Sequence, residues 1–444
     1  MKKFTRILVC LMLFVFAFSF VACGNKDKDK FVYPSSNMTT QGNGGMSVQK
    51  GNYLYFVNGF KSITSTDINK KTKYNIGSLN VTKLDEKGNP VTDDGGIKDD
   101  EYRTITDKLV GYEIADLYIC GDYIYFASPC LENENQDGDQ VWAKDKVVFY
   151  KKKLNNKGKV EKIYQSKVDY EELNYTYFNK GNNAYLLIHE INNDKIVCID
   201  CSNSKVSETT QISSIAFPQN KENVADVFYI KNSTLYKYNV ATNASTEYCL
   251  VDSTAELKYV GGDYVYIIES HNNGSNKDLL VSKISDKSEF EFICASSSYK
   301  DVKISADGKV VVCLDDKFAE YYIVNIGQDM SPKVLTEEES SIKIIGFNTR
   351  DLFYYIESED SIIIKSVSMN NILAGSESEV VEVATISGLD KNYFDIEDDY
   401  IYFYKNAGNG SNLYLHRISV NNPDSTQSAQ MIGMFIDSDI KTEE

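Results

Sequence analysis

The chain has 444 residues and a formal net charge of −17 at pH 7. A protein this acidic repels nucleic acid and anionic lipid, so neither is expected as a ligand of the folded part. The 32 tyrosines and 21 phenylalanines, together with only 6 prolines, favour an all-β fold with aromatic strands. The sequence has no clear apolar periodicity of 3.6 residues, which argues against an α-rich fold.

The N-terminal residues have the pattern of a secretory leader. A short basic start, Met1–Arg6, precedes the apolar run Ile7–Ala22, which is shorter than the ~20 residues of a membrane-spanning helix. Residues 20–24 read FVACG and resemble the lipobox of bacterial lipoproteins. The resemblance implies a lipoprotein signal peptide at residues 1–22, lipidation of Cys23 and attachment to the extracytoplasmic face of the cell membrane. A plainly secreted protein or an uncleaved anchor is the alternative.

Residues 23–45 are predicted to be a flexible tether between the lipid and the folded domain. The segment combines the run KDKDK with a mixture of serine, threonine, asparagine and glycine. Such a composition cannot bury an apolar core. A coil of this length would keep the folded domain close to the membrane.

A short motif recurs along the rest of the chain, and a clear copy is Gly121–Phe126, which reads GDYIYF. Glycine followed by aspartate tolerates the positive φ of a hairpin turn, and the aromatic run after it is typical of a strand covered on both faces. The later copies are spaced close to the roughly 40–50 residues of a propeller blade. Eight copies align on the position of Tyr125: Tyr55, Tyr125, Tyr185, Tyr229, Tyr266, Val311, Tyr354 and Tyr402.

Each copy is expected to be the second strand of a four-stranded antiparallel unit. A strand precedes the turn, as at Leu117–Ile119, and a third and a fourth follow, as at Leu235–Tyr238 and Glu289–Ile293. Units of this kind packed around an axis form a β-propeller. The sequence therefore predicts one all-β propeller over residues 46–437, with eight blades or alternatively seven, and a polar tail at residues 438–444.

The repeated pattern resembles the TolB-like and YWTD-like propellers, including uncharacterised propeller lipoproteins of bacteria. Ser305–Lys309 reads SADGK and is similar to the Ser-Pro-Asp-Gly-Lys of TolB repeats. The resemblance implies the fold, and it implies that the protein binds a protein or another ligand. The YWTD motif itself is absent, so the receptor functions of that group are not implied.

Two polar stretches interrupt the repeats and are predicted to be loop insertions. They are Ser62–Leu109 in the first blade and Leu131–Gln140 in the second. Insertions in repeat proteins often lie on the binding face. The candidate ligand-binding residues in and beside these insertions are Asp93, Asp94, Asp99, Asp100 and Trp142.

The second insertion also resembles half of a calcium loop. Asn133, Asn135 and Asp137 supply oxygen ligands at alternating positions, and a glycine follows them. The acidic ligand expected at the twelfth position is Lys144, so a polar hairpin loop is favoured over a calcium site. No other cofactor is predicted.

Cys198 and Cys201 form a CxxC pattern, but the pattern lies on a predicted strand. There the two sulfurs would point to opposite faces, which excludes a redox pair. The three histidines are scattered, and no GxSxG hydrolase motif is present.

The favoured function is a lipid-anchored binding or scaffolding module for an unknown extracytoplasmic protein, peptide or glycan. The alternative is an enzyme that acts on extracellular polysaccharide or peptide. An enzyme of that kind would gather two or three carboxylates with raised pKa values near the central channel.

Overall fold

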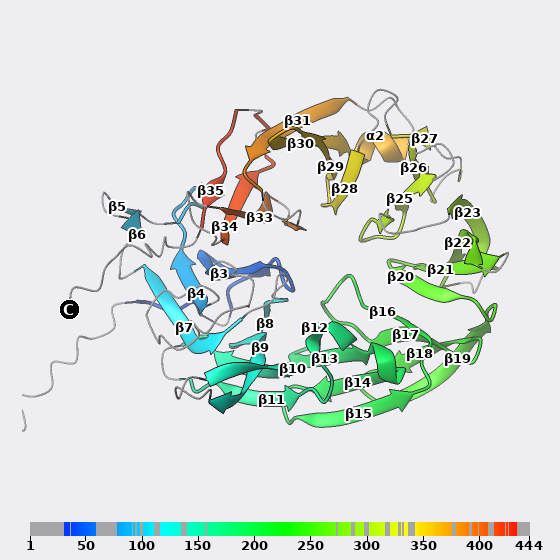
Figure 1. Ribbon diagram of the computed structural model, residues 1–444, viewed down its shortest axis with the longest axis horizontal. Coiled ribbons are helices and arrows are strands. Elements are labelled where there is room, and N and C mark those ends of the chain that lie inside the picture. Colours follow the sequence, from blue (N-terminus) through cyan, green and yellow to red (C-terminus); the bar gives the residue numbers. More distant parts are fainter. Residues whose placement is uncertain are drawn as a thin grey trace, which may run out of the picture.

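The computed structural model describes residues 31–35, 37–58, 78–90, 92–93, 96–97, 101–110, 116–134, 140–155, 158–271, 274–285, 289–296, 302–315, 320–326, 330, 333–335, 342–374, 379–389, 393–397, 399–406, 413–421, 423–424 and 426–432. Eight antiparallel sheets follow one another around a ring, as Figure 1 shows. The prediction of an eight-bladed β-propeller is confirmed, and the seven-bladed alternative is wrong.

The first four blades are formed by consecutive strands. Blade 1 contains β1 (Thr40–Gln41), β2 (Ser47–Lys50), β3 (Tyr53–Val57), β4 (Ser78–Lys83) and β7 (Tyr102–Leu109), and β5 (Thr92–Asp93) and β6 (Gly96–Ile97) form a separate hairpin. Blade 2 contains β8 (Tyr118–Cys120), β9 (Tyr123–Glu134), β10 (Gln140–Lys153) and β11 (Glu161–Gln165). Blade 3 contains β12 (Leu173–Lys180), β13 (Asn183–Glu190), β14 (Lys195–Asp200) and β15 (Lys205–Thr210). Blade 4 contains β16 (Ser214–Ala216), β17 (Asp226–Lys231), β18 (Thr234–Asn239) and β19 (Ala244–Leu250).

The last four blades have the same order. Blade 5 contains β20 (Glu256–Gly261), β21 (Tyr264–His271), β22 (Asn276–Lys283) and β23 (Glu291–Ser296), and blade 6 contains β24 (Lys303–Ile304), β25 (Val310–Asp315), β26 (Glu320–Asn325) and β27 (Lys333–Val334). Blade 7 contains β28 (Ile342–Phe347), β29 (Asp351–Ser358), β30 (Ser361–Ser368) and β31 (Val380–Ser387), with the short helix α2 (Met369–Ala374) between its last two strands. Blade 8 contains β32 (Phe394–Ile396), β33 (Tyr400–Asn406), β34 (Leu413–Ser419) and β35 (Gln430–Met431). Short 3-10 turns, η2 (Tyr170–Glu172) and η3 (Ile191–Asn193), lie in blade 3.

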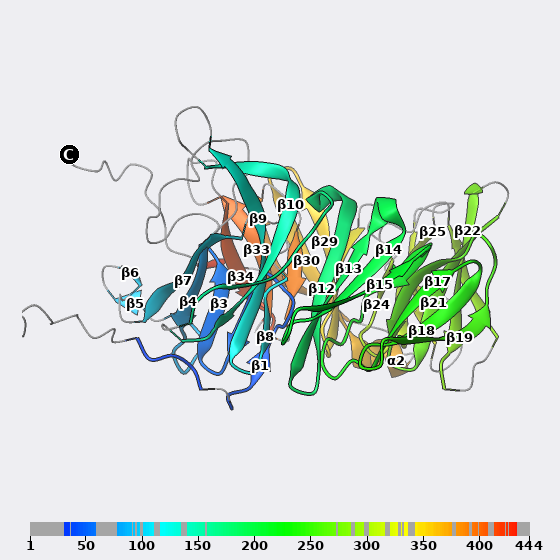
Figure 2. The ribbon, with the colours of Figure 1, turned by 90° about the horizontal axis from the view of Figure 1, so that it is seen from below.

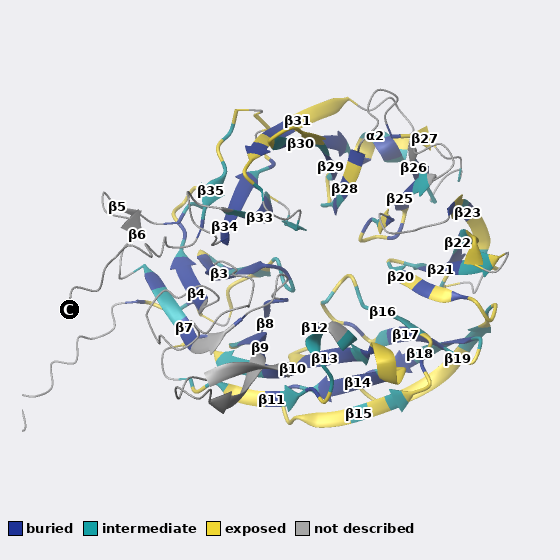
Figure 3. Cartoon of the chain, viewed as in Figure 1, coloured by how far each residue is buried: buried dark blue, intermediate teal, exposed yellow. Residues whose placement is uncertain are grey.

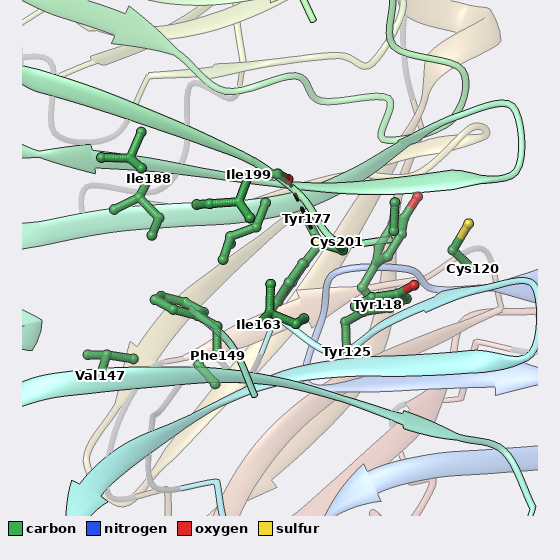
Figure 4. Packing of buried hydrophobic residues seen from close by; sticks show 14 of the residues in the cluster. Tyr118, Cys120, Tyr125, Val147, Phe149, Ile163, Tyr177, Ile188, Ile199 and Cys201 are labelled. Carbon is green, nitrogen blue, oxygen red and sulfur yellow. Dashed lines mark hydrogen bonds between the residues drawn. The ribbon is translucent and has the colours of Figure 1, made fainter. Parts of the chain in front are cut away.

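The eight residues aligned in the sequence all lie on the second strand of the four-stranded unit of their blade, which in blade 1 is β2, β3, β4 and β7 with β1 added at the edge, and each is at most 9% exposed. They pack between blades, as the cluster between blades 2 and 3 shows in Figure 4. There the ring of Tyr125 lies 5.7 Å from that of Tyr177, and Tyr118 stacks on Tyr177 at 6.2 Å. The Tyr177 hydroxyl donates a hydrogen bond to the backbone carbonyl of Phe126 at 3.2 Å. The repeat is therefore the spacer that each blade presents to its neighbour.

Burial falls from the middle strands of a blade to its outer strand, as Figure 3 shows. In blade 3, β13 and β14 are mostly buried and β15 is mostly exposed. Because both faces of a blade are covered by neighbours, the middle strands are apolar at nearly every position rather than at alternate ones. No helix among the described residues is both long enough and apolar enough to cross a membrane.

The prediction of a loop insertion over Ser62–Leu109 is wrong for residues 78–83 and 102–109, which form strands. Ser78–Lys83 and Tyr102–Leu109 are the third and fourth strands of blade 1. Leu79 and Val81 are fully buried, and so is Tyr102. These apolar residues alternate with polar ones, so the stretch looks polar in composition although the polar residues Asn80 and Thr82 are fully buried as well.

The predicted extent of the tether is also wrong at its C-terminal end. Phe31 is 5% exposed and packs against Tyr53, with the ring centroids 5.8 Å apart. The segment then adds β1 to the edge of blade 1, and Gly45 forms a β-bridge with Leu117 of blade 2. Small polar residues satisfied by backbone hydrogen bonds can therefore pack on a sheet without an apolar core of their own.

The ring closes between blades 8 and 1 without exchange of a strand among the described residues. Apolar side chains from the two blades form one cluster, with Leu54 and Phe56 on one side and Tyr402 and Leu415 on the other. Arg417, which is 1% exposed, adds polar contacts. Its guanidinium lies 3.9 Å from the centroid of the Tyr400 ring and donates hydrogen bonds to the Gln430 side chain and to the Gly88 carbonyl.

Candidate functional site

The structure does not test the predicted site residues. Cys23, Asp94, Asp99, Asp100, Asn135 and Asp137 lie outside the described residues. Asp93 lies on β5, Asn133 on β9 and Trp142 on β10, and only their backbone is described. Trp142 is thus on a strand rather than in a loop. The calcium site, the lipidated cysteine and the ligand-binding loops remain predictions.

The second predicted insertion, Leu131–Gln140, is strand at each of its described residues, 131–134 and 140. β9 and β10 remain paired as far as Glu134 and Gln140, so this hairpin is longer than those of the neighbouring blades. Figure 2 shows it continuing past β12 and β13 on one face of the ring. The prediction of a loop over this whole stretch is wrong, because polar residues are compatible with the ladder of backbone hydrogen bonds.

An inner polar cluster, which comprises Asp116, Lys221, Asp395 and Glu397, lies against the N-terminal segment. Lys221 extends from the connection between β16 and β17, which reaches toward the centre of the ring in Figure 1. Its ammonium lies 2.5 Å from Asp116 Oδ1 and donates to the Gly44 carbonyl at 3.1 Å. The other oxygen of Asp116 accepts a hydrogen bond from the Tyr177 backbone N–H at 3.0 Å. One lysine thus links blade 4 to blades 1 and 2.

The remaining two carboxylates come from blade 8. Asp395 Oδ2 accepts a hydrogen bond from the Met46 backbone N–H at 2.7 Å, and Glu397 accepts one from the Ser47 hydroxyl at 3.0 Å. Burial raises the pKa of Asp395, although the Met46 N–H opposes the shift. Burial also raises the pKa of Asp116, against the opposing effect of Lys221. Two carboxylates with raised pKa values therefore occur near the centre of the ring.

Glycines of the N-terminal segment make this close approach possible. A Cβ atom at Gly44 would overlap the Lys221 ammonium, and one at Gly45 would overlap the Asp395 carboxylate. Gly42 lies in the same way against Glu397, with a φ of +68°. The sequence signal for this contact is the pattern GNGG at residues 42–45, which sequence reasoning assigned to the tether. Glycine permits the backbone to meet charged side chains directly.

The inner polar cluster is arranged for ring closure rather than for proton transfer. Asp116 is bound by Lys221 and by a backbone N–H, and Asp395 is bound by the Met46 N–H. Within the described ranges, no group of three or more histidine, cysteine, aspartate or glutamate side chains could hold a metal ion. Both oxygens of Asp116 and one oxygen each of Asp395 and Glu397 are therefore engaged by the protein itself.

A second inner feature is a lysine row, which comprises Lys258, Lys303 and Lys343. Each lysine directly precedes the residue that pairs with the aligned position on the second strand of blade 5, 6 or 7. Lys303 and Lys343 are paired in the ladder, with Val312 and Tyr355, whereas Lys258 is the extra residue at a register shift between Leu257 and Tyr259. All three are exposed, whereas their immediate neighbours on the strand are buried or half-buried. The residues that follow the three lysines pair across the strands with the aligned residues, as Tyr259–Tyr266, Ile304–Val311 and Ile344–Tyr354.

Lys258 has both acidic and basic neighbours. Burial lowers the pKa of Lys258; Glu256 opposes this effect, and Lys303 and Lys277 add to it. Lys343 forms an ion pair with Glu357 at 2.6 Å.

Sequence reasoning missed the lysine row, although the signal is in the sequence. The first strands of the three blades contain the triplets LKY, VKI and IKI, and each triplet precedes an aligned residue on the next strand. Reading the first strands in register, rather than only the second strands, would have found the repeated lysine.

The CxxC pattern behaves as predicted. Cys198 packs in the cluster between blades 3 and 4, and Cys201 packs in the cluster between blades 2 and 3. The two thiols therefore lie on opposite faces of blade 3. Burial raises the pKa of Cys198 to about 12 and raises that of Cys201 well above its usual value. Both are thus unreactive thiols.

Comparisons with known proteins give only distant structural likenesses. No protein family and no curated protein matches the sequence. Dipeptidyl peptidase 4 of Porphyromonas gingivalis is similar in structure at 11% identity, with a TM-score of 0.48 over 88% of this chain and 60% of that chain. A eukaryotic initiation factor is similar at 10% identity, with a TM-score of 0.46 over 89% of this chain and 96% of that chain.

A prolyl endopeptidase is similar at 14% identity, with a TM-score of 0.43 over 72% of this chain and 50% of that chain. This chain therefore covers only about half to three-fifths of the length of the two peptidases. Nothing about activity follows from likenesses of this size. The resemblance to TolB-like and YWTD-like propellers remains a prediction.

Proposed function

We propose that the protein is a lipid-anchored binding module on the extracytoplasmic face of the cell membrane, and that it holds a protein, peptide or glycan ligand through the acidic groups of that ligand. The observation that carries the proposal is the lysine row. Three exposed lysines follow one another on the first strands of three adjacent blades in a chain whose net charge is −17, and one of them, Lys343, is paired with Glu357.

The pKa of Lys258 supports this ligand chemistry. Burial disfavours the charged form of its ammonium, and the neighbouring Lys303 disfavours it further. A carboxylate or sulfate group that enters the row would favour the charged form of the lysines, so its binding would be strengthened by charge-assisted hydrogen bonds. The overall negative charge repels the same ligand at long range, so recognition should depend on these short contacts.

Binding to acidic polymers tests the proposal directly. The full-length protein in detergent would be titrated with poly-L-glutamate and with polygalacturonate, and neutral dextran would serve as the control ligand. The double variant Lys258→Gln/Lys303→Gln should weaken binding by roughly 10-fold or more, which corresponds to about 1.4 kcal/mol. Lys205→Gln, an exposed lysine on the outer strand β15, should leave the affinity unchanged. Equal losses in both variants, or no binding of either polymer, would refute the ligand class.

Membrane attachment needs a separate test. Cys23→Ala should move the protein from the membrane fraction to the soluble fraction, because alanine cannot carry the acyl chains. A variant that stays with the membrane would overturn the lipid anchor without affecting the binding site.

The second candidate function is an enzyme, and the raised pKa values of Asp116 and Asp395 favour it. Such groups are typical of acid–base catalysis. Their engagement by Lys221, Tyr177 and Met46 argues for a structural role instead. Hydrolysis of the same two polymers by the wild type, lost in Asp116→Asn while the melting temperature is kept, would favour the enzyme.

A further inference from the structure

Two cysteines from neighbouring blades meet in the interface between blades 5 and 6. The Sγ atoms of Cys294 and Cys313 lie 2.9 Å apart. Cys294 is on the outer strand β23 of blade 5, and Cys313 is on the second strand β25 of blade 6. Both belong to the apolar cluster that joins the two blades.

The backbone holds the two thiols in this relation from both sides. Cys294 is paired with Leu279 on β22, and Cys313 is paired with Tyr322 on β26. Each cysteine is thus fixed in a ladder of its own blade, and the two strands are neighbours across the interface. This differs from Cys198 and Cys201, which are close in sequence but lie in different clusters.

We propose that Cys294 and Cys313 form a disulfide between blades 5 and 6. The pair is poised for thiol–disulfide exchange with a disulfide oxidant, such as oxidised glutathione or a protein disulfide. The secretory leader predicted at residues 1–22 would deliver the chain to a compartment where such oxidants operate. The inference is independent of the ligand proposed above.

The exposure of the two residues sets the order of the exchange. Cys294 is half-buried and Cys313 is fully buried, so Cys294 meets the oxidant first. Its thiolate attacks one sulfur of the oxidant, which forms a mixed disulfide and releases one thiol. Cys313 then attacks Cys294 Sγ and releases the second thiol. Two cysteine thiols are oxidised, one oxidant disulfide is reduced, and the two cysteine protons end on the two released thiols.

A disulfide here would have a structural effect that the side-chain packing alone does not provide. Neighbouring blades in the described part of the chain do not share a sheet, so the interfaces depend mainly on side-chain contacts. A covalent link would join blade 5, which carries Lys258, to blade 6, which carries Lys303. It would also close a short loop of chain, which restricts the unfolded state.

The experiment is performed on the folded full-length protein in detergent. The sample is treated with oxidised glutathione, alkylated, digested without reduction and analysed by mass spectrometry. One linked peptide pair containing Cys294 and Cys313 is expected, with Cys198 and Cys201 outside any link. Reduction of this sample should lower the melting temperature by about 5 °C. Separate alkylation of Cys294 and Cys313 after oxidation would overturn the proposal.

Variants distinguish this pair from other thiol effects. Cys294→Ser should abolish both the linked peptide and the dependence of the melting temperature on the oxidant. Cys249→Ser, on β19 of blade 4, is the matched control and should retain both. Because Cys313 is fully buried, Cys313→Ala serves as the second variant in place of serine. An oxidant-dependent shift that persists in Cys294→Ser would refute the assignment.

Discussion

Asp395 and Met46 are 349 positions apart in the chain, and the carboxylate of the first accepts a hydrogen bond from the backbone N–H of the second at 2.7 Å. Asp395 pairs with Tyr402, the aligned residue of the last blade. The equivalent position in the other blades is apolar or aromatic: Val48, Tyr118, Phe178, Ile215, Tyr259, Ile304 and Ile344. The last blade therefore replaces an apolar contact with a polar one, and that contact joins it to the first blade.

The effect of Asp395 on stability is expected to depend on the hydrogen bond more than on the charge. Asp395→Ala leaves the Met46 N–H without its acceptor, which should lower the free energy of unfolding by about 1–3 kcal/mol. Asp395→Asn keeps an acceptor and removes a buried charge, so it should be at least as stable as the wild type at pH 7.5. Urea unfolding followed by tyrosine fluorescence measures both. Equal destabilisation of the two variants would contradict this account.

The same residue should produce a defined pH dependence. Burial raises the folded-state pKa of Asp395 above the ordinary 3.8, so the charged form destabilises the fold above that folded-state pKa. As pH falls through the folded-state pKa toward 3.8, the folded state binds the proton first and regains stability. The advantage of Asp395→Asn over the wild type should therefore be largest at pH 7.5 and shrink toward pH 4.

The pH dependence is measured as the difference in melting temperature between the wild type and Asp395→Asn. Burial lowers the pKa of His189 and of His416, so the unfolded state binds their protons first and the fold loses stability below the ordinary histidine pKa of 6.5. This opposing trend is common to the wild type and to Asp395→Asn, and it cancels in the difference of melting temperatures. A difference that grows on acidification would reverse the proposed sign.

The sequence predicts the repeated part of the fold well because each blade repeats the same local environment. A glycine at positive φ shortly precedes the apolar strand in five of the eight copies, as at Gly121 and Gly262, and Val311 shows that the aligned position also accepts valine. Alignment of such positions is enough to count the blades. Third and fourth strands with polar neighbours, such as Tyr102–Leu109, give a weaker pattern and are missed.

The contacts near the centre of the ring were not predictable in the same way. Lys221 meets Asp116 and the Gly44 carbonyl because the closed ring brings three separate segments together. Nothing local to the GNGG pattern distinguishes it from a linker, since its partners are distant in sequence. The lysine row, in contrast, can be found in the sequence by aligning the first strands of the blades.

Arg417 should be a principal determinant of the contact between blades 8 and 1. Arg417→Met preserves much of the side-chain volume but removes the donors to Gln430 and Gly88 and the contact with the Tyr400 ring. We expect a loss of about 2–4 kcal/mol in the free energy of unfolding. Arg350→Met is the matched control, because Arg350 is half-exposed in its ion pair with Asp399 and should change stability by no more than about 0.5 kcal/mol.

Limited proteolysis provides a second measurement for Arg417. If this residue joins the two blades, Arg417→Met should be cleaved faster than the wild type at the connections of blades 1 and 8, because local opening exposes them. Cleavage concentrated in blades 4 and 5 would instead indicate general destabilisation.

The turn glycines offer a test of how closely neighbouring blades approach. Gly121 and Gly262 occupy equivalent turns with nearly equal φ values of +59° and +57°. A Cβ atom at Gly121 would meet nothing within 4 Å, whereas one at Gly262 would overlap the backbone carbonyl oxygen of Asp307 in the next blade. Gly121→Ala should therefore cost only the strain of positive φ, about 1–2 kcal/mol. Gly262→Ala should cost clearly more, because the turn before β25 must also move. Thermal unfolding of the two variants measures the difference in stability. Equal melting temperatures would contradict this prediction, because they would show that the turn before β25 moves at no cost in stability.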